Sequence, residues 1–228
     1  MTATVGVLLP AAGRGERLGP GAPKALRALA GEPLLVRAVR GLRAAPSVGP
    51  VVVAAPASEV GAVADLMAGL DVVVVAGGAE RQESVALALA ALPPGVGLVL
   101  VHDAARCLTP PSVVEAVVAA LRGGAVAVVP VLPVADTVKL VEGDRVVRTV
   151  DRASLRAVQT PQGFARGVLE RAHAEVRTAV TDDASMVEAL GLPVMTVPGH
   201  EEAFKVTRPL DLLLAEAVLS ARTLRARP

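Results

Sequence analysis

Short apolar runs rich in valine and leucine recur along the chain, and each is nearly continuous rather than alternating with polar residues. Continuous runs of this length are typical of strands that are buried on both faces of a parallel sheet. The runs lie at residues 5–9, 51–54, 72–75, 98–101, 126–129 and 194–197. We therefore predict a strand at each of these positions.

Stretches with the apolar spacing of amphipathic helices separate the runs. They lie at residues 33–44, 58–68, 80–91, 111–121, 165–177, 183–190 and 209–225. Strands that alternate with helices in this way predict an α/β fold with a doubly wound, mostly parallel sheet.

One segment, "DTVKLVEGDRVVRTVDR" at residues 136–152, breaks this alternation. Its two β-prone runs flank Glu142-Gly143-Asp144, which predicts a hairpin. A hairpin that projects from an α/β domain exposes apolar side chains unless something covers them. We therefore expect an arm, inserted at about residues 134–153, that packs on a partner subunit or over the active site. A hairpin lying flat on its own domain is an equally good interpretation of the pattern.

Composition narrows the class of protein. The chain has 228 residues, of which 53% are hydrophobic and 20% charged, as expected for one globular domain. A net charge of +1 argues against a nucleic-acid-binding surface. No apolar run approaches the ~20 residues that span a bilayer, and no signal-peptide pattern begins the chain. With Cys107 as the only cysteine, we expect no internal disulfide and a cytoplasmic location.

The first strand runs into a glycine-rich loop, "VGVLLPAAGRGERLGPGAPKAL" at residues 5–26. In a strand–loop–helix unit of this kind, backbone N–H groups face a phosphate. It is not a P-loop, because no glycine directly precedes Lys24, and it is not a dinucleotide fingerprint, because Leu18 takes the third glycine position.

What remains is a longer loop whose glycines allow close backbone approach and which carries two cations. These residues are Gly13, Gly15, Gly19, Arg17 and Lys24. The arrangement suits a triphosphate whose negative charge grows during a reaction. The alternative is a flexible surface loop with ordinary charges. Arginine far outnumbers lysine in the chain, so the retained Lys24, Lys139 and Lys205 hint at places that need a compact ammonium group.

Two further segments follow predicted strands. Asp103, in "VLVHDAAR", lies just past the end of a strand, where α/β sheets bind ligands, and its carboxylate suits a Mg²⁺–phosphate complex. A carboxylate that caps a turn is the alternative. Gly77-Gly78, in "VVVVAGGAERQESV", would let a flat base lie against the backbone, although a simple turn fits as well. His102 is interpreted as a packing or orienting residue and Cys107 as a buried thiol.

Several segments in one order resemble a known family. They are "AAGRGERLG…PK", "GG…R..SV", "HDAAR", "ADTVK", "R.SL.AVQTPQ.F", "TDDAS" and "KVTRPLDL". Together they resemble the 2-C-methyl-D-erythritol 4-phosphate cytidylyltransferases of the non-mevalonate isoprenoid pathway, from about residue 5 to 225. The chain departs from the usual pattern of that family at Ala25, Cys107 and Ala203.

The resemblance implies a Rossmann-like domain of the nucleotidyltransferase type and a β-arm that builds a homodimer. It implies an enzyme that uses CTP and Mg²⁺ to convert methylerythritol phosphate into its CDP derivative and pyrophosphate. Nucleic acid and membrane are not expected as partners. Two alternatives stay open: a ribitol 5-phosphate cytidylyltransferase, and a nucleotide-binding protein that has lost catalysis.

The resemblance also implies roles for individual residues. Arg17, Lys24 and Lys205 correspond to cations around the α-phosphorus of CTP. The candidate CTP-binding residues are Ala11, Ala12, Gly13, Gly15, Gly78, Ser84 and Asp103. Asp103 is also the candidate metal ligand. The candidate methylerythritol phosphate contacts are Thr137, Arg152, Thr160 and Thr181, some of them reaching the site of the neighbouring subunit.

Overall fold

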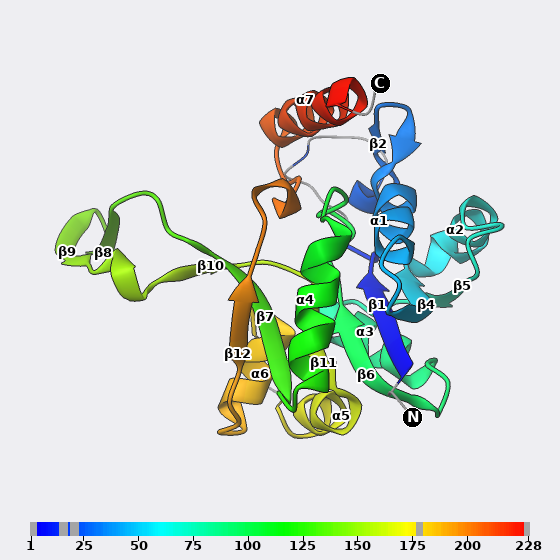
Figure 1. The fold of residues 1–228 in the computed structure, drawn as a ribbon, viewed down its shortest axis with the longest axis horizontal. Coiled ribbons are helices and arrows are strands. Elements are labelled where there is room, and N and C mark those ends of the chain that lie inside the picture. Colours follow the sequence, from blue (N-terminus) through cyan, green and yellow to red (C-terminus); the bar gives the residue numbers. More distant parts are fainter. Residues whose placement is uncertain (1–3, 14–17, 19–22, 177–179, 226–228) are drawn as a thin grey trace.

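The computed structural model describes residues 4–13, 18, 23–176 and 180–225 (Figure 1). Its centre is an eight-stranded sheet in the order β10-β7-β11-β6-β1-β4-β5, with β12 also paired to β7. The strands are β1 (Thr4–Pro10), β4 (Val48–Ala55), β5 (Val72–Ala76), β6 (Val96–Val101), β7 (Ala127–Pro133), β10 (Arg156–Val158), β11 (Gln162–Ala165) and β12 (Met195–Pro198). The six strands predicted from apolar runs are all present and run in one direction, which confirms the mostly parallel α/β fold.

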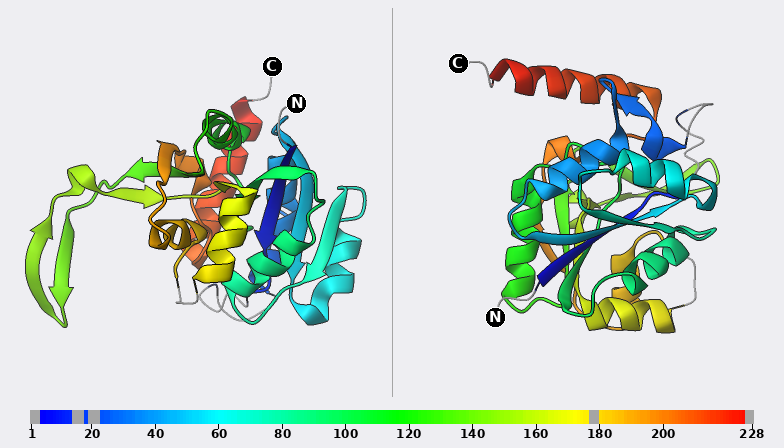
Figure 2. Two further views of the ribbon diagram at one scale, coloured as in Figure 1. Left: turned by 90° about the horizontal axis from the view of Figure 1, so that it is seen from below. Right: turned by 90° about the vertical axis from the view of Figure 1, so that its right-hand side faces the viewer.

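Helices cover both faces of this sheet (Figure 2). They are α1 (Leu34–Arg43), α2 (Val60–Leu66), α3 (Arg81–Ala90), α4 (Pro111–Arg122), α5 (Arg166–Glu175), α6 (Asp183–Ala189) and α7 (Pro209–Arg225), each close to a predicted range. A small two-stranded sheet, β2 (Ala28–Leu29) and β3 (Glu32–Pro33), precedes α1. Within the described residues, no helix is both long enough and apolar enough to cross a bilayer.

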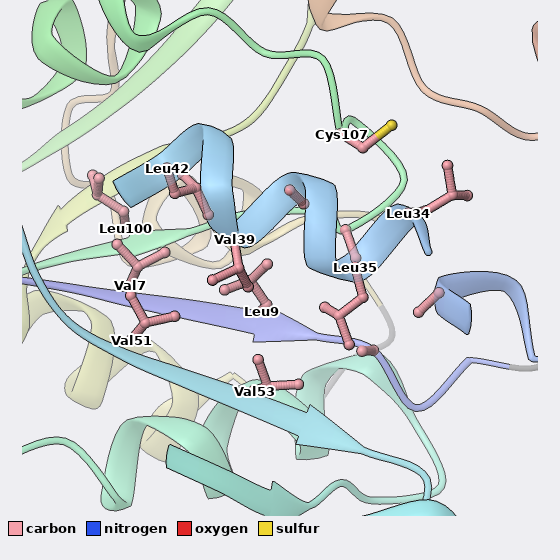
Figure 3. Close-up of a cluster of buried hydrophobic side chains, with 14 of the residues drawn as sticks. Val7, Leu9, Leu34, Leu35, Val39, Leu42, Val51, Val53, Leu100 and Cys107 are labelled. Atoms are coloured by element: carbon pink, nitrogen blue, oxygen red, sulfur yellow. The ribbon is translucent and has the colours of Figure 1, made fainter. Parts of the chain in front are cut away.

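Alternation along the strands divides the core into two layers. Val7 and Leu9 of β1 belong to the cluster that contains α1, α2 and α4, which Figure 3 shows in part. Leu8, between them, belongs to the cluster on the other face, with α3, α5 and α6. All three side chains are fully buried, so both faces of β1 are covered. This explains why the run reads as continuously apolar.

Two short strands, β10 and β11, were not predicted from the apolar runs. Both run antiparallel to their neighbours, and β11 inserts between β6 and β7. β11 has the sequence QGFA, in which Gln162 and Phe164 are buried. Such a short strand with a buried polar residue carries no apolar run, which is why composition did not reveal it.

The predicted hairpin forms and projects from the body of the molecule (Figures 1 and 2). Its strands, β8 (Val138–Glu142) and β9 (Arg145–Val150), pair with each other in a separate sheet. The turn contains Gly143 with a φ of +55°, which favours glycine. The projecting arm is thus confirmed, and the interpretation of a hairpin lying flat on its own domain is wrong. The arm points away from the sheet of its own chain (Figures 1 and 2).

Candidate active site

A cavity of about 210 Å³ lies at the carboxyl ends of β1, β5 and β6. The carboxyl edge of parallel strands is where doubly wound sheets bind ligands. Its lining comes from the segment after β1, the turn between β5 and α3, the segment after β6, and two separate residues. The lining residues are Pro10, Ala11, Ala12, Gly13, Ala25, Gly78, Ala79, Glu80, Arg81, Ser84, Asp103, Ala104, Ala105 and Lys205.

The turn between β5 and α3 contributes Gly78, Ala79 and Glu80 to this cavity. A Cβ at Gly77 would lie 2.7 Å from the Cβ of Ala12, so this position requires glycine. Ser84, only 2% exposed, accepts a hydrogen bond from the Gly78 N–H at 3.1 Å and so fixes the turn. Glycine at this turn leaves room for a ligand to approach the backbone.

A second cavity, of about 200 Å³, adjoins the first. It lies between the segment after β6, the segment from β10 to β11 and the start of α6. Its lining residues are Arg81, Asp103, Arg106, Val158, Gln159, Thr160, Gln162, Thr181, Asp182 and Lys205. Arg81, Asp103 and Lys205 line both cavities, and we call these residues the shared wall.

Asp103 is the centre of the shared wall. Its carboxylate pairs with the Lys205 ammonium at 2.7 Å and lies 3.7 Å from Arg81 Nε and 3.9 Å from Arg106 Nε. Burial acts to raise the pKa of Asp103, but the charges of Lys205 and Arg81 outweigh it and lower this pKa to about 2. Asp103 is therefore ionised at neutral pH.

The segment that carries Lys205 is fastened to the segment after β6. The Val206 N–H donates to the Ala105 carbonyl at 2.9 Å, and Arg106 Nη1 donates to the Ala203 carbonyl at 2.8 Å. These bonds lie on either side of Lys205, so its backbone is held beside Asp103. In the sequence, the segments that carry Asp103 and Lys205 are separate motifs. The fold places them in contact.

His102 and Thr160 support Asp103 from behind. The Asp103 N–H donates to Thr160 Oγ1 at 3.0 Å, and the same hydroxyl lies 3.1 Å from His102 Nδ1. Burial lowers the pKa of His102 to about 4, and its ring is 1% exposed. A neutral, buried imidazole agrees with the interpretation of His102 as an orienting residue.

The predicted site residues fall into three groups. Those that line the first cavity are Ala11, Ala12, Gly13, Gly78, Ser84, Asp103 and Lys205, and those that line the second include Thr160 and Thr181. Thr137 and Arg152 are exposed at the base of the arm and line neither cavity of their own chain. Gly15 and Arg17 lie outside the described residues. Lys24 begins a short 3₁₀ helix (Lys24–Leu26), and its side chain also lies outside the description.

Sequence reasoning gave no role to several residues that line the cavities. Arg81 and Arg106 stood within the quoted motifs "GG…R..SV" and "HDAAR", which was the only signal for them. Gln162 and Asp182 line the second cavity, where Gln162 Nε2 donates to Asp182 Oδ2 at 2.6 Å. No spacing along the chain links these two, since their contact depends on how β11 meets α6.

A divalent metal would find one well-placed carboxylate here. No group of three or more His, Cys, Asp or Glu side chains that could hold a metal ion occurs among the described residues. Asp103 is the carboxylate common to both cavities. Mg²⁺ commonly takes one or two carboxylates and completes its shell with phosphate oxygens and water. The donor set therefore fits a Mg²⁺ that arrives with a polyphosphate, and it does not fit an all-protein metal cage.

Comparisons with known proteins agree with one another on the family. The sequence profile of the 2-C-methyl-D-erythritol 4-phosphate cytidylyltransferase family matches residues 5–221. A relative with that name from Streptomyces coelicolor is 60% identical over 97% of this chain and 87% of its own. One from Frankia casuarinae is 63% identical over 95% of this chain and 81% of its own. The crystal structure of the Thermus thermophilus enzyme of that name superposes with a TM-score of 0.78, at 43% identity, over 94% of this chain and 98% of its own.

Proposed function

This chain belongs to the 2-C-methyl-D-erythritol 4-phosphate cytidylyltransferase family, and we propose that its two adjoining cavities bind the two substrates of that reaction. The observation that carries the proposal is the shared wall. A carboxylate and two cations, Asp103, Arg81 and Lys205, line both the first cavity and the second one. Two phosphorylated substrates bound side by side would meet there.

CTP occupies the first cavity. Its cytosine lies against the turn at Gly78 and Ser84, and its ribose and phosphates follow Ala11, Ala12 and Gly13 toward the glycine-rich loop. Gly15, Arg17 and Lys24 act on the triphosphate from that loop. Support for this orientation comes from Ser84, which is buried and lines the first cavity alone, and from Lys205, which lines both cavities.

Methylerythritol phosphate occupies the second cavity, beside Thr160 and Thr181. Thr137 and Arg152 lie at the base of the arm and line neither cavity of their own chain, so we assign them to the site of a second copy. The exposed apolar side chains of the arm support this homodimer, because Leu140, Val141 and Val146 are each more than 40% exposed. The chain then works as a single nucleotidyltransferase domain, 1–228, with an inserted arm.

The reaction is largely electrostatic. A phosphate oxygen of methylerythritol phosphate attacks the α-phosphorus of CTP and forms the new P–O bond. The bond from that phosphorus to the bridging oxygen of the β-phosphate breaks, and pyrophosphate leaves with the electron pair. The attacking phosphate is already ionised, so no general base is required. Lys205, with Arg17 and Lys24, stabilises the charge that grows on the five-coordinate phosphorus.

Mg²⁺ is part of the proposal, with Asp103 as its protein ligand. When bound, the ion would neutralise phosphate charge and help pyrophosphate to leave. Asp103 suits this role because its pKa, lowered to about 2, keeps it anionic at any physiological pH. We place the enzyme in the cytoplasm, where nucleoside triphosphates are available.

Pyrophosphate release from CTP, run in parallel with methylerythritol 4-phosphate and ribitol 5-phosphate, tests the function. We expect release with the first acceptor only. Release with ribitol 5-phosphate alone would keep the chemistry and replace the substrate. Saturable CTP binding with no release from either acceptor would favour the catalytically inactive alternative, although the names of the relatives favour neither alternative.

A further inference from the structure

Arg81 is the member of the shared wall that has no role so far. It is the first residue of α3 and lines both cavities together with Asp103 and Lys205. Its side chain is 33% exposed, so part of the guanidinium faces the cavities while the rest is packed. Arg106, the other arginine that pairs with Asp103, lines the second cavity alone.

A buried carboxylate holds Arg81 in this position. Arg81 Nη1 pairs with Asp183 Oδ2 at 2.7 Å, and the Asp183 side chain is completely buried. His173 Nε2 lies 3.2 Å from the other oxygen, Asp183 Oδ1, and the His173 side chain is 6% exposed. This ion pair with a fully buried carboxylate keeps the guanidinium beside the two cavities, although Asp183 Oδ2 accepts no hydrogen bond of good geometry from the described residues.

Arg81 has donor capacity left for a ligand. Its Nε lies 3.7 Å from Asp103 Oδ1, which is longer than a hydrogen bond. Burial acts to lower the pKa of Arg81, but Asp183 and Asp103 raise it overall, so the cation persists at neutral pH. The contact with Asp103 is an attraction between charges over 3.7 Å. Among the described residues, Asp103 and Asp183 are the groups that Arg81 pairs with, which leaves N–H donors for a phosphate oxygen.

We propose that Arg81 is a further phosphate-binding residue of this enzyme. It donates hydrogen bonds to phosphate oxygens of the nucleotide and of the acceptor where the two cavities meet. Asp183 and His173 are positioning residues that act through Arg81. The inference rests on the proposed function, since it is the phosphates of CTP and of methylerythritol phosphate that would meet at this wall.

The primary test replaces Arg81 with methionine and with lysine. A charge-assisted hydrogen bond lost from the nucleotide predicts a Kd for CTP raised about tenfold in calorimetry without acceptor. Loss of charge stabilisation at the reacting phosphates predicts a kcat lowered by about 10²-fold. Arg81→Lys retains the charge but not the fork that reaches Asp183 and the ligand together, so it recovers only part of the loss. Arg171→Met, in an exposed pair with Glu175, is the matched control and leaves every constant unchanged.

Arg81→Met leaves the Asp183 carboxylate buried without its cation, which can prevent folding. The double variant Arg81→Met/Asp183→Asn removes both charges together and keeps the test valid. If this folded variant binds CTP and turns over acceptor within twofold of the wild type, the proposal is overturned. An unchanged Kd for CTP would overturn the contact with the nucleotide even if the constants for the acceptor change.

His173 tests the positioning role separately. His173→Leu removes a contact to Asp183 but keeps both partners of the Arg81–Asp183 pair, and we expect the KM for methylerythritol phosphate to rise several-fold with a smaller change in kcat. His173→Gln, which can donate to Asp183 Oδ1, restores the wild-type KM. A loss of stability with unchanged KM would show that His173 is structural only. If the wild type binds CTP but turns over no acceptor, the proposed function fails alone, and the Kd of the Arg81 variants still decides their role.

Discussion

The shared wall and the projecting arm differ in the kind of side chain that each buries or exposes. At the wall, Asp103 lies close to the side chains of Lys205, Arg81 and Arg106. Asp183, which pairs with Arg81, is completely buried. On the arm, Leu140, Val141, Val146 and Val147 are exposed although they are apolar. Charges that are buried and apolar groups that are exposed both cost free energy in an isolated chain.

Both costs have a functional reason in our account. Three cations held around one carboxylate are ready to receive additional phosphate charge, which water would otherwise solvate. The apolar side chains of the arm are ready to receive a second copy of the chain. The charged groups of the wall thus find their partners within one chain, whereas the apolar side chains of the arm are covered only in a dimer. This contrast can be tested.

Deletion of residues 138–149 should have the largest effect of all, a change in the oligomeric state of the protein. We expect the wild type to be a dimer and the deletion variant to be a monomer in light scattering, because the exposed apolar strands would be gone. Val141→Asp should weaken the dimer, whereas Leu87→Asp, at another exposed apolar position on α3, should not. A deletion variant that remains dimeric contradicts the role of the arm.

Among changes at the shared wall, Lys205→Ala should lower turnover the most. Removal of a cation that lies 2.7 Å from Asp103 predicts a turnover lower by about 10²–10³-fold, comparable to loss of an oxyanion donor. Arg171 provides the control, because it is exposed and pairs with Glu175 on the surface of α5. Pyrophosphate release by Arg171→Ala should stay near the wild-type rate, and a wild-type rate for Lys205→Ala as well would remove Lys205 from the mechanism.

The buried imidazole of His102 should make stability depend on pH. Burial lowers its pKa from 6.5 to about 4, so the unfolded chain binds the proton more readily than the folded one between these values. The free energy of unfolding should therefore fall by about 3 kcal/mol as pH drops from 6.5 to 4. Urea unfolding at several pH values measures this, and His102→Gln should flatten the slope. An unchanged slope in that variant assigns the pH dependence to other groups.

Cys107 should show the smallest effect. It is buried, and burial raises the pKa of its thiol to about 11. We expect almost no reaction with an aromatic disulfide reagent at pH 8 in the folded protein, and rapid reaction of one thiol once guanidinium unfolds it. Fast labelling of the native protein would show that the thiol is accessible.

The strands could be predicted where burial on both faces of the sheet requires a continuous apolar run. β1, β4 and β6 carry continuous apolar runs because helices cover them on both sides. β11 carries none, since its buried Gln162 bonds to Asp182 rather than packing in an apolar layer. The arm was recognised as a hairpin, but whether it projects depends on tertiary contacts that local patterns do not record.

The sequence marked the separate segments of the site, but it did not predict the contacts between them. Asp103 and Lys205 were each marked by a motif, yet their 2.7 Å contact depends on hydrogen bonds between distant segments, one of them from the Arg106 side chain. Asp183 was interpreted as part of a helix start, and the sequence does not show that it anchors Arg81. Such contacts need the sheet to bring α3, α6 and the segment after β6 to one edge.

The central claim is that the acceptor phosphate in one cavity attacks the α-phosphorus of the nucleotide in the other. Methylerythritol 4-phosphate carrying ¹⁸O in its phosphate tests this directly, with the products analysed by mass spectrometry. Our account predicts ¹⁸O in the CDP product and unlabelled pyrophosphate. An unlabelled CDP product, with the ¹⁸O released as inorganic phosphate, would contradict it.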